Sequence, residues 1–398
     1  MSDGRKDIWN DDDGEREARR AERAEKNGKL KSFLTFLLAL ALVLAVVVLA
    51  AYRDGTGFDI LRRYLNYGRP EQTGGTALYA YDASPKNRFA AVEENLAVLS
   101  ETSLRLFDKN GQELWSVDVN MGAPALTAGG GRLAAYDVGG TSLYVANAGG
   151  MLLELTAAEG EPFLAASLNE DGWLAVTAEK KGCKGCVSVY DPEMKLAFAF
   201  DSRRRFVLDG CVVGKRLAAV TLGQENGVFV SNIVLYELTK EEPTADYDIS
   251  GGLVAAIGQQ NGKIAAISDT GLSYAKPDGE IEASYSYGGD YLRDFDLGGD
   301  GFTALLLNRY RSGSVGRLVT VDSDGAELGT LEVREEILSL SAAGRYLAVL
   351  YSGRLEVYNQ DLQTYASLRG VEDVREVLMR PDGAVLMLSG SSASLFLP

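Results

Sequence analysis

A short apolar segment rich in small residues recurs eight times along the chain. The copies are NLAVLS at 95, GRLAAYD at 131, GWLAVTA at 172, KRLAAVT at 215, GKIAAIS at 262, GFTALLL at 301, RYLAVLY at 345 and GAVLMLS at 383. They align on Leu96, Leu133, Leu174, Leu217, Ile264, Thr303, Leu347 and Val385, and each copy starts about forty residues after the one before. Such a period restricts the chain to a repeat architecture.

Each copy belongs to a unit with four predicted strands. A second apolar strand such as SLRLFD or SLYVAN follows it, then a turn such as DKNG or DSDG, then a third strand such as ELWSVDV. A leading strand such as ILSLSA starts the unit. Four short strands at a period of about forty residues indicate the blade of a β-propeller. We therefore predict an all-β propeller of eight four-stranded blades over 76–398, or seven blades if one weak unit merges with its neighbour.

The two ends of the predicted propeller complement each other. The last unit reaches Pro398 after only three strands, and an unpaired strand, TALYAYD, runs from Thr76 to Asp82 before the first full unit. This N-terminal strand can supply the missing outer strand of the last blade. Such closure joins the ends of the ring and removes an exposed sheet edge.

The segment before the propeller predicts a membrane anchor. Phe33 to Tyr52 contains no charged residue, and twenty such residues in a helix span roughly the 30 Å hydrocarbon layer. We expect a transmembrane helix over 32–52, a charged cytoplasmic tail over 1–31 and an interfacial collar and linker over 53–75. Residues 12–32 hold seven Lys and Arg against four in 52–70, which places the N-terminus in the cytoplasm and the propeller outside. A cleaved signal peptide is the alternative, because VLA at 48–50 resembles a cleavage site.

Charge and composition exclude several functions. The net charge is −16, and the first 31 residues hold nine basic and nine acidic residues, so the excess lies in the rest of the chain. An acidic body repels nucleic acid, and we expect none as a partner. The chain has no histidine, which removes histidine triads and histidine metal sites. We predict no catalytic constellation, no cofactor and no metal site.

Three long junctions between the second and third strands carry the candidate binding face. They are EKKGCKG, LGQENGVFVS and NRYRSGSVG, in units three, four and six, and the same junction opens on the same face in every blade. Their cations are Lys180, Lys181, Lys184, Arg309, Arg311 and Arg317. A basic rim on an acidic body attracts anionic partners. Hairpin tips that only keep the protein soluble are the simpler interpretation.

A CxxC motif lies within the first of these junctions. Cys183 and Cys186 flank Lys184 and Gly185 in a predicted turn, whose ends lie close to the Cα spacing of a disulfide. We predict a disulfide there. A thioredoxin-type site needs a helix start, and zinc needs a second ligand pair where the chain offers only Cys211.

Two features of the chain resemble known proteins. FDKNGQELW resembles the Asp-x-x-Gly-x-x-x-Trp turn of quinoprotein-like (PQQ-like) propeller repeats, with Asp108, Gly111 and Trp115 matching. No Trp-Asp signature is present, so a true WD40 protein is disfavoured. The whole layout of charged tail, single span, FDILRRYLNYG collar and propeller is similar to a bacterial family of membrane-anchored propellers of unknown function, family 5711. That resemblance implies an envelope location and no assigned activity.

These observations predict a single-pass, extracytoplasmic propeller that binds a protein or an envelope polymer as a scaffold. One alternative is a carboxylate-based hydrolase or lyase acting on an envelope glycan, which would need two inward carboxylates about 5 to 10 Å apart. Asp294, Asp296 and Asp300 are the nearest cluster, with nothing in the sequence to distinguish them from solvated loop acids. A second alternative is a sensor that signals through residues 1–31.

Overall fold

The computed structural model describes residues 31, 33–47, 59, 63, 64, 67, 77–249 and 252–398. The chain divides into two units, Met1–Asn66 and Tyr67–Pro398. In the first, residues 33–47 are helical, and their large apolar side chains are exposed. None of the helical residues described forms a helix long and apolar enough to cross a membrane. The predicted tail, apart from Lys31, and nearly all of the predicted collar lie outside the described residues.

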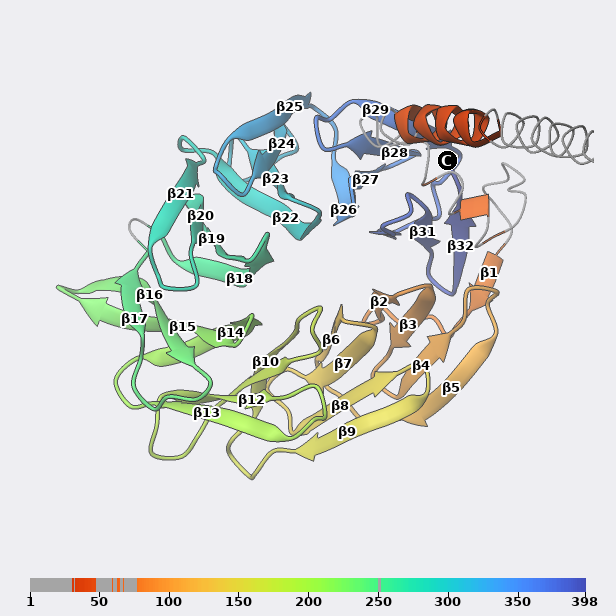
Figure 1. The fold of residues 1–398 in the computed structure, drawn as a ribbon. Helices are drawn as coiled ribbons and strands as arrows, with labels where there is room; N and C mark the ends of the chain where they lie inside the picture. Colours follow the sequence, from red (N-terminus) through yellow and green to blue (C-terminus); the bar gives the residue numbers. More distant parts are fainter. Residues whose placement is uncertain are drawn as a thin grey trace, which may run out of the picture. The chain divides into compact units, whose positions relative to one another are not determined.

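The second unit consists of eight four-stranded antiparallel sheets (Figure 1). Blade 1 consists of β2 (Arg88–Val92), β3 (Asn95–Leu99), β4 (Ser103–Phe107) and β5 (Glu113–Asp118), and blade 2 of β6 (Pro124–Gly129), β7 (Arg132–Asp137), β8 (Ser142–Asn147) and β9 (Gly150–Thr156). Blade 3 consists of β10 (Phe163–Leu168), β11 (Leu174–Ala178), β12 (Gly185–Tyr190) and β13 (Leu196–Ser202), and blade 4 of β14 (Phe206–Val213), β15 (Arg216–Glu225), β16 (Val228–Glu237) and β17 (Ala245–Asp248). Blade 5 consists of β18 (Val254–Gln260), β19 (Lys263–Ser268), β20 (Gly271–Ala275) and β21 (Ile281–Ser286), and blade 6 of β22 (Tyr291–Gly299), β23 (Phe302–Asn308), β24 (Gly316–Asp322) and β25 (Glu327–Val333). Blade 7 consists of β26 (Ile337–Ala343), β27 (Tyr346–Tyr351), β28 (Arg354–Asn359) and β29 (Thr364–Arg369), and blade 8 of β30 (Glu376–Met379), β31 (Val385–Leu388), β32 (Ser392–Phe396) and β1 (Ala77–Ala80).

The eight repeated segments form the second strand of each blade, as predicted. They correspond to β3, β7, β11, β15, β19, β23, β27 and β31. These strands are buried on both faces, for example throughout Phe302–Asn308 and Tyr346–Tyr351. A strand between two neighbouring sheets has no solvent face, so its sequence is continuously apolar rather than alternating. The prediction of eight blades is confirmed, and the seven-blade alternative is wrong.

The ring closes through its N-terminal strand. β1 pairs antiparallel with β32, with Ala77 opposite Ser394 and Ala80 opposite Ser392. Just beyond β1, the Tyr81 hydroxyl lies 2.9 Å from the Ser389 carbonyl oxygen and 2.7 Å from that of Ser392. The first strand therefore supplies the outer strand of the last blade, which confirms the predicted closure.

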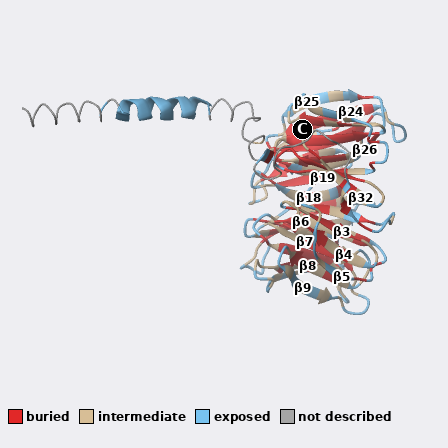
Figure 2. Ribbon diagram, turned by 90° about the vertical axis from the view of Figure 1, so that its right-hand side faces the viewer, coloured by how far each residue is buried: buried red, intermediate tan, exposed pale blue. Residues whose placement is uncertain are grey.

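The hydrophobic core lies in layers between the blades. Each cluster of buried apolar residues contains side chains from two adjacent blades, and one such layer occurs at each of the eight interfaces. Figure 2 shows the buried residues concentrated inside the stacked sheets. The layer between blades 8 and 1 includes Tyr79, Leu96, Phe107 and Leu386. Each sheet depends on both neighbours, so ring closure is part of the core.

The Asp-x-x-Gly-x-x-x-Trp segment of blade 1 forms a turn and a contact with blade 2. The Asp108 carboxylate accepts hydrogen bonds from the backbone amides of Asn110 and Gln112, and Gly111 has a φ of +82°. Nε1 of Trp115 donates to the carbonyl oxygen of Asn147 in β8 at 2.9 Å. The tryptophan therefore fastens the outer strand of one blade to the next blade.

Replacing Trp115 with phenylalanine is expected to lower the free energy of unfolding by about 1 kcal/mol, because a half-buried hydrogen bond is lost while an aromatic six-membered ring is kept. Urea unfolding followed by circular dichroism measures this. An unchanged midpoint would show that the hydrogen bond to Asn147 contributes nothing.

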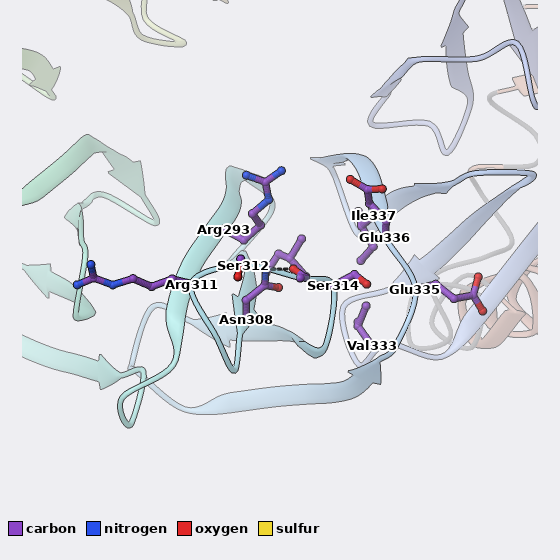
Figure 3. A pocket seen from close by; sticks show the side chains of 11 residues that line it. Arg293, Asn308, Arg311, Ser312, Ser314, Val333, Glu335, Glu336 and Ile337 are labelled. Atoms are coloured by element: carbon purple, nitrogen blue, oxygen red, sulfur yellow. Dashed lines mark hydrogen bonds between the residues drawn. The ribbon is translucent and has the colours of Figure 1, made fainter.

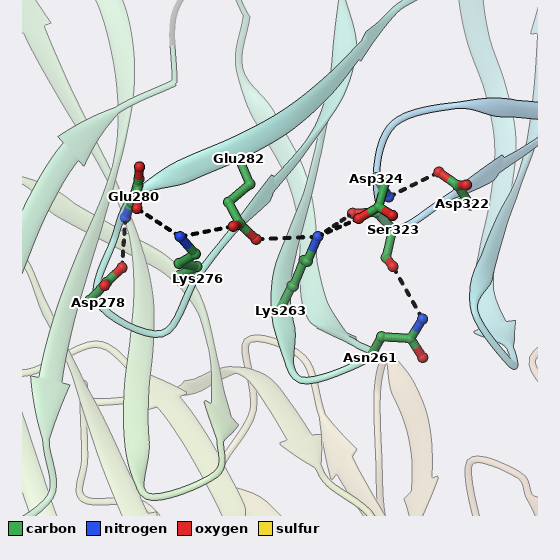
Figure 4. A network of polar contacts seen from close by, with 9 residues as sticks. All are labelled: Asn261, Lys263, Lys276, Asp278, Glu280, Glu282, Asp322, Ser323 and Asp324. Atoms are coloured by element: carbon green, nitrogen blue, oxygen red, sulfur yellow. Dashed lines mark hydrogen bonds and ion pairs between the residues drawn. The ribbon is translucent and has the colours of Figure 1, made fainter.

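Charged side chains add a second connection between blades 5 and 6 (Figure 4). Lys263 on β19 lies 3.2 Å from Glu282 of its own blade and 2.8 Å from Asp324 in the turn between β24 and β25. Lys276 lies 2.9 Å from Glu282, so that carboxylate is shared by two ammonium groups. These charges are mutually neutralised, and we assign them a structural role.

One predicted loop is absent. LGQENGVFVS, expected to be an extended junction, continues both strands of a hairpin. β15 and β16 pair from Arg216 opposite Glu237 to Glu225 opposite Val228. The reversal needs only Asn226 and Gly227, whose φ values are +50° and +83°. An Asn-Gly pair adopts this two-residue turn readily, so the flanking residues remain in strands.

Candidate interaction face

The strand order of the blades sorts all connections onto two faces. The junctions between second and third strands and the junctions between successive blades open on one face, here called the loop face. The remaining turns open on the other, here called the turn face. In blade 3 the Lys184 amide donates to Ser202 O at 2.7 Å, which joins the loop after β11 to the end of β13. The loop face therefore includes interblade segments that the sequence reasoning did not consider.

The three predicted lysines of blade 3 differ in their surroundings. Nζ of Lys180 lies 2.6 Å from an oxygen of Asp201, so its charge is paired. The backbone amide of Lys181 donates to Glu161 at 3.0 Å. Nζ of Lys184 lies 4.5 Å from the ring centroid of Phe206, within cation–π distance. Lys184 and Lys181 have no ion pair within the described part of the chain.

The three predicted arginines of blade 6 also differ. Nε of Arg317 lies 2.8 Å from Asp290, and its Nη1 lies 3.7 Å from Glu327, so its charge is neutralised inside the structure. Arg311 lies 5.5 Å from the centroid of Tyr291. Blades 4 and 5 separate these arginines from blade 3. The six predicted cations therefore do not form one continuous rim.

The interblade segment between β13 and β14 carries a basic run that sequence reasoning missed. Arg203 and Arg204 are exposed, and neither has an ion pair among the residues described. Arg205 lies 2.6 Å from Glu225 of the β15–β16 hairpin, which connects the run to that hairpin. Three consecutive arginines at a junction on the loop face were the signal that could have identified this segment.

Exposed apolar side chains lie beside this basic run. Phe206 is 52% exposed, and at the hairpin tip Val228 is 64% and Phe229 is 59% exposed. The surface formed by these residues and the neighbouring cations is here called the blade-4 patch. Its members are Lys184, Arg203, Arg204, Phe206, Val228 and Phe229. The patch combines unpaired positive charge with apolar surface, the combination that an interaction site presents to an anionic and partly apolar partner.

A pocket of about 320 Å³ lies between blades 6 and 7 (Figure 3). Asn308, Ser312, Ser314, Val333 and Ile337 line it. Figure 3 shows the guanidinium groups of the two arginines at its border pointing away from each other. The pocket therefore does not direct two cations at one anion.

The predicted disulfide is not formed in the structure, which has Cys183 and Cys186 as free cysteines. Cys186 is already part of β12, opposite Ala178, and its thiol lies 3.6 Å from the Ala178 carbonyl oxygen. Cys183 lies in the preceding turn, where its amide donates to Lys180 O. Strand pairing therefore directs the Cys186 thiol to β11. Burial raises the pKa of this thiol.

Carboxylates lie on the first strands that surround the central axis. Asp296 on β22 accepts hydrogen bonds from the amides of Gly298 at 2.6 Å and Ala342 at 2.9 Å. Burial raises its pKa to about 6. Asp296 is thus a half-buried link between blades 6 and 7, which corrects its interpretation as a solvated loop acid. Among the residues described, no three Cys, Asp or Glu side chains form a group that could hold a metal ion.

A cavity of about 700 Å³ occupies the turn-face end of the axis. In seven blades the turn between the first and second strands lines it, blade 4 contributes Cys211 and Val212 of β14, and glycines form much of the lining. Its charged members are Glu93, Arg132, Glu170 and Asp300. Arg132 is already engaged with the carbonyl oxygens of Gly172 and Pro192. The cavity therefore offers backbone rather than a convergent set of charges.

Asp209 on β14 provides a pH-dependent test of the blade-4 interior. Burial raises its pKa to about 6, and its only hydrogen-bond donor within the described residues is the Gly210 amide at 2.7 Å. The unfolded chain loses this proton near pH 4, so stability falls as the pH rises from about 4 to 6. Asp209→Asn is therefore expected to be more stable than wild type by about 1–2 kcal/mol at pH 7.

The same difference should vanish near pH 3, where Asp209 is protonated in both the folded and the unfolded state. Urea unfolding of both proteins across this range measures it. A difference that stays constant from pH 3 to pH 7 would contradict burial of the charge.

Comparison with known proteins identifies the family. A family model described as "Family of unknown function (DUF5711)" matches residues 76–387. The chain belongs to this family. The DUF5711 match covers the propeller and confirms the family expected from the sequence. No protein of curated function matches the sequence.

Solved structures resemble this DUF5711 protein in fold. One is the quinohemoprotein alcohol dehydrogenase ADHIIG from Pseudomonas putida HK5, with a TM-score of 0.53, 10% identity, and coverage of 80% of this chain and 72% of that chain. Another comes from the Mitotic Checkpoint Complex, with a TM-score of 0.51, 13% identity, and coverage of 83% and 98%. Identities this low show the propeller fold alone.

Proposed function

We propose that this protein is a membrane-anchored, extracytoplasmic propeller that holds a partner protein or envelope polymer on its loop face and so acts as a scaffold. The observation that carries the proposal is the blade-4 patch, an exposed basic and apolar surface on a strongly acidic protein. The proposed role is binding rather than catalysis, and it requires only this surface and a fixed location.

The charge of the patch supports partner binding. The whole protein has a net charge of −16, so a local group of cations without counter-charges is an exception to its surface. Lys184, Arg203 and Arg204 form that group. A local positive field accelerates encounter with an anionic partner and contributes specificity. The apolar side chains beside it supply area that is buried once the partner is bound.

The proposed location rests on the N-terminal sequence. Phe33 to Tyr52 lacks charged residues, and residues 33–47 are helical with exposed apolar side chains. The excess of basic residues before this segment favours a cytoplasmic N-terminus. Protease added to intact cells should therefore digest the propeller and spare an N-terminal tag. Digestion only after lysis would contradict this orientation.

The scaffold proposal is tested by crosslinking tagged full-length protein in living cells. We expect wild type to give a defined adduct that Arg203→Glu/Arg204→Glu loses. The matched control, Lys195→Glu/Lys215→Glu, makes the same charge change at exposed lysines on the turn face and should retain the adduct. Absence of any adduct from wild type would overturn the scaffold role.

A further inference from the structure

We infer that the partner held by the blade-4 patch is an acidic protein segment with large apolar side chains. This inference rests on the proposed function and names the partner class of the same surface. Two observations carry it: the projecting hairpin and the unpaired cations.

The hairpin tip supplies an apolar projection. β14 pairs with β15 only as far as Leu222, and β17 pairs with β16 only from Asn232 onward. The residue pairs from Gly223 opposite Val230 to Glu225 opposite Val228 therefore extend beyond the sheet as a two-stranded ribbon. Val228 and Phe229 sit on this ribbon, each more than half exposed. Such side chains contribute favourable binding free energy only when a partner covers them with apolar groups of its own.

The cations select an acidic partner. Arg205 is committed to Glu225 at 2.6 Å and Asp248 at 3.7 Å, and these contacts fix the base of the hairpin. Arg203 and Arg204 are left exposed beside it without counter-charges in the described chain. Each guanidinium can bind a carboxylate through two parallel hydrogen bonds. A partner with carboxylates next to apolar side chains satisfies both halves of the patch.

A phosphate-rich polymer or a lipid headgroup would satisfy only the cationic half of the blade-4 patch. Phosphate groups would pair with Arg203 and Arg204 but would leave Val228 and Phe229 in water. An anionic bilayer could take up the apolar tip, so anionic vesicles are one of the probes in the experiment below.

Tyr67 is bound to the propeller far from the patch. The Tyr67 hydroxyl accepts a hydrogen bond from Nη1 of Arg380 at 3.0 Å. Arg380 is 1% exposed and also donates to the Glu94 carbonyl oxygen at 2.8 Å. Burial raises the pKa of Tyr67 to about 12, so its hydroxyl stays protonated at neutral pH. The incoming chain is thus held at a turn between β30 and β31.

This turn lies on the turn face of blade 8, whereas the patch lies on the loop face of blade 4. Blades 4 and 8 are opposite each other in a ring of eight. The Tyr67 contact and the patch therefore lie on opposite faces of the propeller and on opposite sides of its ring.

The test uses full-length protein in nanodiscs of neutral phosphatidylcholine. A displayed library of short random peptides is selected on wild type, and the selected peptides are measured by fluorescence anisotropy. We expect enrichment of Asp and Glu next to Phe, Leu, Ile or Val. Arg203→Glu/Arg204→Glu and Phe229→Ser should each weaken binding about ten-fold or more, and added salt should weaken it further.

Two controls separate these effects from misfolding. Lys195→Glu/Lys215→Glu matches the charge change, and Leu196→Ser matches Phe229→Ser because Leu196 is 60% exposed at the start of β13. Both should bind within about two-fold of wild type. Peptides without acidic residues, or equal loss in control and patch variants, would overturn the inference.

Inorganic polyphosphate and phosphatidylglycerol vesicles are tested with the same variants. Binding of either that depends on Arg203 and Arg204, together with failure to select acidic peptides, would assign the patch to a polymer or a lipid and overturn the protein-segment inference. A cellular adduct that survives Arg203→Glu/Arg204→Glu would overturn the blade-4 patch as the binding surface, and with it this inference, but would leave a scaffold role through another surface. Absence of any adduct from wild type would instead overturn the scaffold role.

Discussion

Replacing Tyr79 with alanine is expected to lower the free energy of unfolding by about 3–5 kcal/mol, because it removes a buried aromatic ring from the closure of the propeller. Tyr79 is 1% exposed on β1, and its ring packs edge-on against Phe107 of blade 1 with centroids 6.1 Å apart. The ring thus connects the closing strand to the first blade. Loss of this contact weakens the one interface that joins the two ends of the chain.

Equilibrium unfolding in urea, followed by intrinsic fluorescence, measures the effect. Tyr310→Ala is the matched control, since Tyr310 is 62% exposed and should cost less than about 0.5 kcal/mol. Similar midpoints for Tyr79→Ala and wild type would show that ring closure contributes little to stability.

Gly111→Ala is expected to lower the free energy of unfolding by about 2–4 kcal/mol, through backbone strain and through a steric clash. Gly111 has a φ of +82°, and a Cβ there would lie 1.9 Å from the Leu78 carbonyl oxygen of β1. Because the obstacle is backbone, β1 itself must move. The turn of blade 1 and the closing strand are therefore coupled through one glycine.

Gly139→Ala separates the two contributions. Gly139 has a φ of +76° with nothing within 4 Å of the added Cβ, so it reports strain alone, about 1 kcal/mol. Both variants are compared by thermal and urea unfolding. Equal destabilisation by the two substitutions would contradict the clash with β1.

The sequence predicted the propeller correctly because its signal repeats. Every second strand lies between two sheets, so all eight show the same run of small apolar residues, and their spacing reveals the blades. The closing strand was predictable because TALYAYD was left over at one end and one strand was missing at the other. A feature that occurs once, such as the Asn226-Gly227 hairpin, has no other copy in the chain for comparison, and it was interpreted as a loop.

The candidate site was predicted less well, because pairing depends on residues distant in the chain. Arg317 appeared free in the sequence, yet its partner Asp290 lies 27 positions earlier on an interblade segment. Lys180 is similarly paired with Asp201, 21 positions away. Only the junctions between second and third strands were predicted to carry the binding face, so Arg203 and Arg204 were missed. Topology places these interblade residues on the same face.

A photo-crosslinking amino acid at position 229 of the full-length protein tests the central claim most directly. The same amino acid at position 196, in place of Leu196, serves as the comparison site. In living cells we predict a discrete adduct from position 229, its loss in Arg203→Glu/Arg204→Glu, and no equivalent adduct from position 196. Equal adducts from both positions, or an adduct from position 196 alone, would contradict a scaffold that binds its partner through the blade-4 patch.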